Sequence, residues 1–511
     1  MKKIVCFSII FIQFTMKVYG EKLVVTNNGN SGSGTLHQAA IDANFDDTIT
    51  FDNSIDSIFT NCHIVIRKSI SIISNKIVVI KSQSNDLLCA TFVFNNDTSQ
   101  IYIQNIAFVG RGQSIRNFSK ATIKLFNCSF ENILGALGGK GGGAIFNSGN
   151  LIIERTSFIN NKTHNMYSLL GGHGVNGGAI YNEGNLILTN CTFWNNSTSN
   201  GGDGKDGAMG ICFGGPGNDG GNGGNGGDGA NGGDGGAIFN TGSCIITNCT
   251  FSSNSTGKGG NGGKGGSGGQ CPPLFIYDGT PWTWGFVVNG RTGSSGSNGK
   301  NGKKGLGDGI YSTKEIIIRN SIINDTIYGP FFSKNFNIII NVDSAVIKGS
   351  TDYNLIGINP CIDSARNNGG FIKTCLLFSN SPAINAIITG NGAPDFDARG
   401  YLRNELPDIG SFEYNGVLPQ MKGSEEFSSS KGIIFYPNPT NNRIEISFKF
   451  HLESNYVIEI VDLKGDVLNQ VTKGKDETKV LVDMSKYQEG LYILRIYLEN
   501  EIFSKKIIKL Q

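Results

Sequence analysis

The stretch Gly177–Asn196, GGAIYNEGNLILTNCTFWNN, is the repeating unit around which the chain is built. It returns as Gly142–Asn161, GGAIFNSGNLIIERTSFINN, and as Gly235–Asn254, GGAIFNTGSCIITNCTFSSN, and a degenerate copy begins at Asp308. Such self-similarity is typical of a solenoid, in which each unit is covered by its neighbours. One copy is too short to bury both of its faces, so the copies must stack.

Each copy carries the pattern of short strands and lacks that of a helix. Residues alternate between two faces along Leu186–Thr189, and one face is apolar. Asn190 interrupts the alternation and Asn195–Asn196 interrupts it again. Asparagine tolerates the left-handed backbone and can close its own turn. The pattern predicts three strands per copy separated by bends, with these side chains pointing inward: Ile180, Leu186, Leu188, Cys191 and Phe193.

The phenylalanine near the end of each copy indicates the register. Phe108 and Phe130 are 22 residues apart, which we take as a bare coil, and the next gaps are 28, 35 and 58 residues. The excess is mostly glycine-rich, so loops are expected to leave a constant coil. The fold class is therefore all-β, a right-handed parallel β-helix of roughly a dozen coils. Three cysteines share one repeat position and predict a ladder of buried thiols: Cys128, Cys191 and Cys249.

Composition limits the function classes. The formal net charge is +2, so no strong electric field favours nucleic acid. The five histidines do not recur in the repeats, and the cysteine spacing does not match a zinc site. We therefore expect no metal or other cofactor.

Two glycine-rich insertions interrupt the repeats, at about 199–235 and 257–308. The first has a period of three. Gly223–Asp228 matches the start of a calcium-binding nonapeptide, but the period and Ala230 argue against it. Collagen is excluded because the insertion has almost no proline. Two alternatives stay open: extended arms packed on the rod, or disorder.

The second insertion contains an aromatic island at Cys271–Val288, CPPLFIYDGTPWTWGFVV. Its aromatic side chains could form a platform on which sugars stack, and the candidates are Trp282, Trp284 and Tyr277, with Phe275 beside them. The simpler and favoured interpretation is a small apolar cluster that pins the loop.

Residues 1–20 read as a secretory leader, with two lysines before a short apolar run and cleavage between Gly20 and Glu21. The run is too short to span a bilayer, and no later run resembles a transmembrane helix. Residues 22–51 predict a cap with one short helix, whose apolar face holds Leu36, Ala39, Ala40 and Ala43. Asp46–Asp47 and His37 could act in acid–base chemistry, but a turn before a strand is the better interpretation.

Residues 359–414 lack the coil pattern. Cys361 and Cys375 flank a Gly369–Gly370 turn, so a disulfide could join them in an exported protein. The motifs NNGGFIKTCLLFSNSPAINA and DARGYLRNELPDIGSFEY, with the start GSGTLHQAAIDAN and the repeats, resemble bacterial surface β-helix proteins. They are similar to polymorphic outer-membrane-protein repeats and to the choice-of-anchor Q family. The resemblance covers about 23–414 and implies surface display but no reaction.

A polar linker, 415–431, precedes a second domain, 432–511, whose short alternating runs predict a small antiparallel β-sandwich. The residues FYPNPTNNRIEI, VDLKGDV, VDMS, GLYILRI and KKIIK closely resemble the type A C-terminal sorting domain of type IX secretion in Bacteroidetes. That resemblance implies the type IX secretion machinery as a partner and a secreted or outer-membrane-surface location. The positions expected to carry the signal are Pro437, Asn438, Pro439, Gly465, Gly490, Tyr492, Lys505 and Lys506.

Two function classes remain. The first is a non-catalytic surface or secreted protein that binds surface glycans, or host or matrix molecules, as an adhesin or matrix component. The second is a carbohydrate-active enzyme, a polysaccharide lyase or glycoside hydrolase, because this fold also supports such sites. An enzyme needs paired carboxylates, or calcium with a Lys or Arg base. The outward repeat positions carry Asn, Thr and Ser, which favours the first class.

Overall fold

The chain forms two compact units in a computed structural model, Met1–Leu418 and Pro419–Gln511. In the first unit the structure describes residues 20–61, 63–83, 89–96, 98–135, 141–165, 171–212, 215–277, 284–342, 347–350, 352–388 and 391–418. In the second it describes residues 426–428, 433–436, 440, 442–448, 452, 454–462, 467–488, 490–498 and 501–509.

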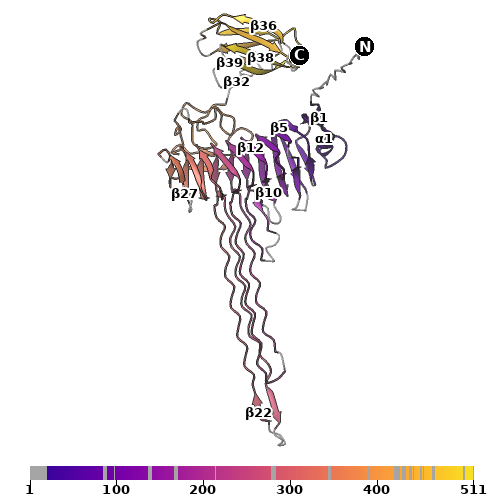
Figure 1. The fold of residues 1–511 in the computed structure, drawn as a ribbon, viewed down its shortest axis with the longest axis vertical. Coiled ribbons are helices and arrows are strands. Elements are labelled where there is room, and N and C mark those ends of the chain that lie inside the picture. The colour runs from indigo at the N-terminus through magenta and orange to yellow at the C-terminus, as the bar shows by residue number, and fades with distance from the viewer. Residues whose placement is uncertain are drawn as a thin grey trace, which may run out of the picture. The chain divides into compact units, whose positions relative to one another are not determined.

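The repeats form a parallel β-helix, as predicted (Figure 1). Each copy contributes three strands; those of the second copy are β15 (Ile180–Asn182), β16 (Asn185–Thr189) and β17 (Thr192–Trp194). Each strand pairs in parallel with its counterpart in the coils before and after. Phe158 pairs with Phe193, and Phe193 pairs with Phe251, so the register inferred from the phenylalanines is confirmed.

Three ladders of strands run along the coils. The first contains β4 (Ile64–Ile66), β6 (Ala90–Phe94), β8 (Gln113–Asn117), β11 (Ile145–Asn147), β15, β18 (Ile238–Asn240) and β23 (Ile310–Ser312). In the described residues the second holds eleven strands, which are β1 (Lys22–Val25), β2 (Asp47–Phe51), β5 (Ile70–Ser82), β7 (Gln100–Arg111), β9 (Thr122–Phe126), β12 (Asn150–Glu154), β16, β19 (Ser243–Thr247), β24 (Ile316–Arg319), β26 (Phe331–Lys334) and β28 (Ile347–Ser350). At about 4.8 Å per strand this ladder is roughly 50 Å long.

The third ladder uses the later halves of β5 and β7, which bend from one ladder into the next. Its other strands are β3 (Ser57–Thr60), β10 (Ser129–Gly135), β13 (Ser157–Ile159), β17, β20 (Thr250–Ser252), β25 (Ile322–Tyr328), β27 (Ile338–Val342) and β29 (Leu355–Ile356). The short strand β14 (Lys162–Thr163) pairs with β10.

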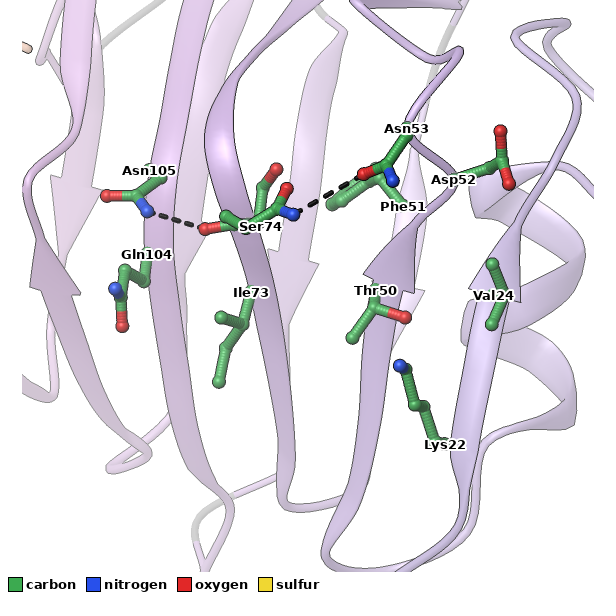
Figure 2. A pocket seen from close by; sticks show the side chains of 11 residues that line it. Lys22, Val24, Thr50, Phe51, Asp52, Asn53, Ile73, Ser74, Gln104 and Asn105 are labelled. Carbon is green, nitrogen blue, oxygen red and sulfur yellow. Dashed lines mark hydrogen bonds between the residues drawn. The ribbon is translucent and has the colours of Figure 1, made fainter. Parts of the chain in front are cut away.

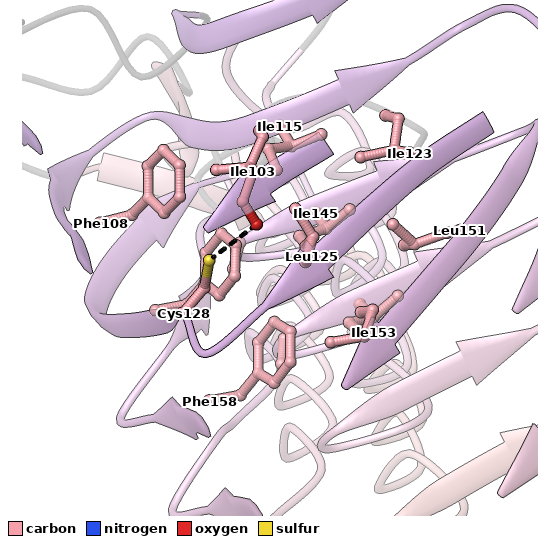
Figure 3. Packing of buried hydrophobic residues seen from close by; sticks show 14 of the residues in the cluster. Ile103, Phe108, Ile115, Ile123, Leu125, Cys128, Ile145, Leu151, Ile153 and Phe158 are labelled. Atoms are coloured by element: carbon pink, nitrogen blue, oxygen red, sulfur yellow. Dashed lines mark hydrogen bonds between the residues drawn. The ribbon is translucent and has the colours of Figure 1, made fainter. Parts of the chain in front are cut away.

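Stacked phenylalanines and aliphatic side chains fill the coils (Figure 3). The ring centroids of Phe130 and Phe158 are 4.8 Å apart, those of Phe158 and Phe193 4.7 Å, and those of Phe193 and Phe251 4.5 Å. The five side chains expected to point inward are buried. The three repeat cysteines are free, buried thiols, as predicted.

Residues with a left-handed backbone, mostly asparagines, shape both bends of each copy. Asn190 has a φ of 52° and Asn195 a φ of 54°, which is the left-handed region. The first of these positions is Arg155 in the first copy, and its φ is 49°. Another row of asparagines is turned inward. The Asn196 amide donates to Asn254 Oδ1 over 2.8 Å, and Asn161 donates to Asn196 Oδ1 over 2.9 Å.

The N-terminal end is capped as expected. Helix α1 (Leu36–Asp42) buries Leu36 and Ala39, and the Thr35 hydroxyl accepts a hydrogen bond from the Gln38 N–H at its start. A side-chain acceptor at this position satisfies one of the free N–H groups of the first turn. Asp47 begins β2, and the Asp46 turn has a φ of 66°.

The two insertions fold together into one structure, here called the Gly arm. It consists of four extended segments, 199–211, 219–235, 257–270 and 290–307, which run side by side away from the coils (Figure 1). Backbone hydrogen bonds join them at every third residue; Gly204 N–H donates to Asn261 O and Gly227 N–H to Lys205 O, both over 2.8 Å. This period and the extended backbone are those of polyproline II. The insertions are therefore extended, but they pack on one another and not on the rod.

Glycine content follows the packing of the Gly arm. The two inner segments, 219–235 and 257–270, each bond to three neighbours and have glycine at about two positions in three. The outer segments bond to two neighbours and have glycine at one position in three. A Cβ on Gly263 would lie 2.1 Å from Lys205 O, which is impossible without moving a segment. Aspartates satisfy other amides; Asp203 Oδ1 accepts from Asn261 N–H over 2.7 Å.

Residues 359–418 fold back onto the coils. The hairpin of β30 (Ile362–Arg366) and β31 (Thr374–Leu377) begins this segment. Buried ion pairs hold it together, with Arg403 Nη1 3.0 Å from Glu413 Oε2 and Arg399 Nη2 2.7 Å from Asp397 Oδ2. The Arg403 guanidinium also donates to Asn190 Oδ1 over 3.0 Å, which ties the segment to a coil bend.

The predicted Cys361–Cys375 disulfide is wrong. Both cysteines are free thiols. The antiparallel register explains this, because Cys375 pairs with Ala365 while Cys361 O accepts from Phe378 N–H. The two cysteines are therefore offset along neighbouring strands.

The second unit is an antiparallel sandwich of two four-stranded sheets, as predicted. One sheet holds β32 (Glu426–Ser428), β33 (Ile433–Tyr436), β34 (Arg443–Phe448) and β37 (Lys479–Asp483); the other holds β36 (Val467–Lys473), β35 (Tyr456–Val461), β38 (Gly490–Leu498) and β39 (Glu501–Lys509). The expected linker, 415–431, is shorter than predicted, because Val417 pairs with Leu402 and β32 pairs with β33.

Candidate functional site

The far end of the Gly arm carries a β-hairpin. Strands β21 (Leu274–Tyr277) and β22 (Trp284–Val288) pair in antiparallel fashion. A disulfide joins Cys212 to Cys271, with a Cα–Cα distance of 5.0 Å, and thereby ties the first arm segment to the third just before the hairpin. The hairpin is thus held by a covalent bond at the end of four hydrogen-bonded segments.

The hairpin exposes apolar side chains on both of its faces. On one face Leu274, Ile276 and Val288 are 39%, 43% and 41% exposed. On the other, Phe275 and Val287 are 53% and 49% exposed. Two further apolar side chains of the first arm segment, Met209 and Ile211, are exposed at 73% and 56%. We call these seven residues the arm tip.

The predicted sugar-stacking platform falls within the same hairpin. Trp282 lies outside the described residues. Tyr277 and Trp284 pair across β21 and β22, but their side chains also lie outside the described set. Sugar stacking by these residues therefore remains a prediction. The aliphatic residues of the tip were not predicted, although the sequence shows a continuous apolar run, Leu274–Ile276, and the flanking Cys212 and Cys271.

A groove of about 610 Å³ lies near the N-terminal end of the rod, across β1, β2, β5 and β7 (Figure 2). Figure 2 shows its amide-rich lining; Asn75 donates to Asn53 Oδ1 over 3.4 Å, and Asn105 donates to Ser74 O over 2.5 Å. Hydrogen bonds from Ser54 lower the pKa of the Asp52 carboxyl at its edge. Amide and hydroxyl groups suit hydrogen bonds to a polar ligand. The lining holds one carboxylate, Asp52, and not the pair that glycoside hydrolysis uses.

Asp308 and Asp325 are two carboxylates of the rod that interact with each other. Burial raises the pKa of Asp325 to about 7, and the charge of Asp308 adds to this shift. Burial alone would raise the pKa of Asp308, but hydrogen bonds from Thr256 and Lys304 outweigh it and lower the pKa. The Asp325 oxygens accept from Asn254 N–H and Nδ2 over 3.2 and 2.6 Å. Asp325 is therefore engaged in the interior of the rod, and the half-buried Asp308 is held by Thr256 and Lys304.

The described parts of the chain contain neither a metal-binding cluster nor a membrane-spanning helix. No group of three or more His, Cys, Asp or Glu side chains there could hold a metal ion. None of the helices in those parts is long and apolar enough to cross a membrane.

The residues expected to carry the sorting signal are only partly described. Pro437, Asn438, Pro439 and Gly465 lie outside the described residues. Gly490 begins β38, and the Tyr492 hydroxyl donates to Gln488 O over 2.8 Å. Lys505 and Lys506 lie in β39, the partner of β38, where Lys505 is half-buried.

The second unit matches a known family model. Residues 434–510 match the family described as the secretion system C-terminal sorting domain. The C-terminal unit is a type IX sorting tail. This places the protein outside the cell or on its surface and implies the type IX secretion machinery as a partner. No curated protein matches the chain significantly.

Proposed function

We propose that this protein is a non-catalytic adhesion protein whose Gly arm presents the arm tip to a protein partner. The exposed apolar hairpin is the observation that carries this proposal. Soluble proteins seldom leave large contiguous apolar patches exposed, and those that do commonly use them for binding. The arm-tip side chains are aliphatic apart from Phe275, which suits an apolar protein surface, whereas sugars favour aromatic faces.

The Gly arm supports this role through its length. Thirteen residues of polyproline II backbone span about 40 Å. Because hydrogen bonds join four such segments and the Cys212–Cys271 disulfide closes the end, the tip is held at a distance from the rod. A contact made there does not require the partner to approach the coils.

A carbohydrate-active enzyme is the alternative. The oxygens of Asp325 are taken by Asn254, and Asp308 accepts hydrogen bonds from Thr256 and Lys304. The groove near the N-terminus offers amides and a single carboxylate. These features support binding over hydrolysis or elimination.

The experiment measures retention of the labelled full chain on cells of the producing culture. One set of cells is treated with proteinase and another with periodate, which destroys sugars. The tip variant combines Leu274→Ser, Ile276→Ser and Val288→Ser. The matched control combines Val65→Ser, Ile187→Ser and Ile356→Ser, three rod positions exposed at 40%, 38% and 40%.

We expect the tip variant to lose at least about tenfold in retention, equal to about 1.4 kcal/mol. The control should bind like the unmodified chain, and proteinase treatment of the cells should abolish binding. Equal retention of both variants would exclude the tip as the contact. Binding that periodate abolishes would favour a glycan partner, and release of reducing or unsaturated sugars from polysaccharides would establish the enzyme instead.

A further inference from the structure

Asp47 is a buried carboxylate at the start of the rod. Its residue is 1% exposed. One oxygen, Oδ1, accepts a hydrogen bond from the Glu21 N–H over 2.5 Å, and the other accepts from the Asn44 N–H over 2.6 Å. Among the described ion pairs none involves Asp47. An ionised carboxylate buried without a counter-charge is costly, so this site favours a cation.

The cation can come from the chain itself. The sequence predicts that the leader is cut between Gly20 and Glu21, and the nitrogen released by that cut is the atom that already contacts Asp47. In the hydrolysis the water oxygen bonds to the Gly20 carbonyl carbon as the C–N bond breaks. Both water protons end on the Glu21 nitrogen, which leaves a carboxylate on Gly20 and an ammonium group on Glu21. We propose that Asp47 is the docking site for the α-ammonium group of the mature N-terminus.

The surrounding backbone already holds Glu21 in place. Glu21 O accepts from Thr48 N–H over 2.8 Å, and the next residue, Lys22, pairs with Thr48 in the β1–β2 ladder. Cleavage would therefore add a charge without moving the strand. Gly20 is crowded, because a Cβ there would lie 1.8 Å from Asp46 O. If the leader is retained, the chain must continue through the crowded position of Gly20. The Glu21 nitrogen then stays in a neutral peptide bond.

Docking links processing to folding of the cap. Before cleavage Asp47 would be buried against neutral N–H groups only, and after cleavage it gains an opposite charge at hydrogen-bond distance. Breaking a buried ion pair is strongly destabilising, because it leaves one buried charge without its partner. The first strand of the rod would thus reach full stability only in the processed chain.

The test compares two purified full chains, one beginning at Glu21 and one beginning at Gly20. In the second chain the Glu21 nitrogen is an amide and the charge is displaced by one residue. Each is made with Asp47 and with Asp47→Asn, and Asp42→Asn at an exposed helix position serves as the charge-matched control. Asp47→Asn should lower the thermal midpoint more in the chain beginning at Glu21, by at least about 2 °C.

A second measurement needs no substitution at Asp47, so it does not require a substituted chain to fold. The α-amine of the chain beginning at Glu21 should react with an amine-labelling reagent at least about tenfold more slowly than that of the chain beginning at Gly20. Mass spectrometry of the exported protein should find Glu21 as its first residue. Equal labelling of the two chains, equal effects of Asp47→Asn in both, or a different first residue would each overturn the proposal.

Discussion

Asparagine has two different roles in the repeats. At the bends its short polar side chain lets the backbone adopt positive φ, as at Asn190 and Asn195. Inside the coil, Asn161, Asn196 and Asn254 pass hydrogen bonds from one coil to the next. This inner row ends on Asp325, whose two carboxylate oxygens accept hydrogen bonds from the backbone N–H and the Nδ2 of Asn254. The last residue of the inner row is therefore a carboxylic acid, whereas the preceding residues are amides.

That change predicts a pH dependence. Burial raises the pKa of Asp325 to about 7 from an ordinary value of 3.8, so the folded state holds a proton that the unfolded state releases. The stabilisation is full below about pH 4 and is lost as the pH rises through about 7. The substitution Asp325→Asn keeps a hydrogen-bonding side chain at the end of the inner row and removes the ionisable group. We expect it to stabilise the rod by roughly 1–3 kcal/mol at pH 8 and to have little effect at pH 4.

Thermal unfolding at the two pH values measures this difference. Asp56→Asn is the control, because the Asp56 side chain is 84% exposed and should not change the pH profile. If Asp325→Asn shifted the midpoint equally at both pH values, the raised pKa would not be the cause.

Single residues show what a sequence can and cannot disclose. The inward side chains Leu186, Cys191 and Phe193 could be predicted because their spacing repeats in every copy. Asp325 could not be recognised as the end of the inner row, because its partner Asn254 is 71 residues away and the degenerate copy obscures the register. The role of Asp47 could not be recognised either, because its partner, the Glu21 N–H, is 26 residues away and no repeat relates the two.

At the scale of elements, the glycine content of each segment of the Gly arm determines how many neighbouring segments it can pack against. A segment with one glycine per triplet offers one side on which other backbones can approach, and a segment with two offers a wider one. The period of three was visible in the sequence. The choice of neighbours was not, because each triplet resembles the next and the pairing depends on where the segments leave the coils.

Gly263→Ala tests this packing. The added Cβ would meet Lys205 O at 2.1 Å, so the first and third segments should separate. We expect proteolysis within 199–308 to accelerate at least about tenfold, while the rod stays resistant. Peptide mass mapping after limited digestion would locate the cuts. Ser295→Ala, at an exposed position of the fourth segment, should leave the digestion unchanged; an equal effect of both variants would contradict the packing.

The disulfides show the same limit of sequence reasoning. Cys361 and Cys375 lie near each other along the chain, yet strand register keeps them apart. Cys212 and Cys271 are 59 residues apart and are bonded, because the arm segments bring them together. Proximity in sequence was the wrong guide, and only the pairing of the segments identifies the correct bond.

At the scale of the whole molecule, the chain joins two units with separate cores. The rod has its own continuous apolar interior, and the sandwich has another around Phe435, Tyr456 and Leu494. The motifs of 432–511 could be recognised from the sequence because they are those of a known family, whose model matches residues 434–510. The arm tip has no such motif, since an exposed aliphatic surface has no distinctive spacing.

The two separate cores lead to the last prediction. Deleting residues 419–511 removes the sorting tail and leaves the rod core complete, so the truncated chain should fold but stay inside the outer membrane. A shorter deletion would not be informative. Strand β39 pairs with β38 along its whole length and buries Ile507, so removing 501–511 alone would expose the sandwich core and invite degradation. The deletion of 419–511 therefore removes the sorting signal without disturbing the fold of the rod.

Cell fractionation with a protease-resistance assay measures both properties. We expect resistant rod in the periplasm and at most about a tenth of the normal amount outside. The arm-tip variant is the matched control, because it changes the rod unit but keeps the tail, and it should be exported normally. Fusing residues 415–511 to a passenger with a leader should carry that passenger out. Normal export of the truncated chain would mean that the rod itself carries a sorting signal. The C-terminal unit would then not be required for export.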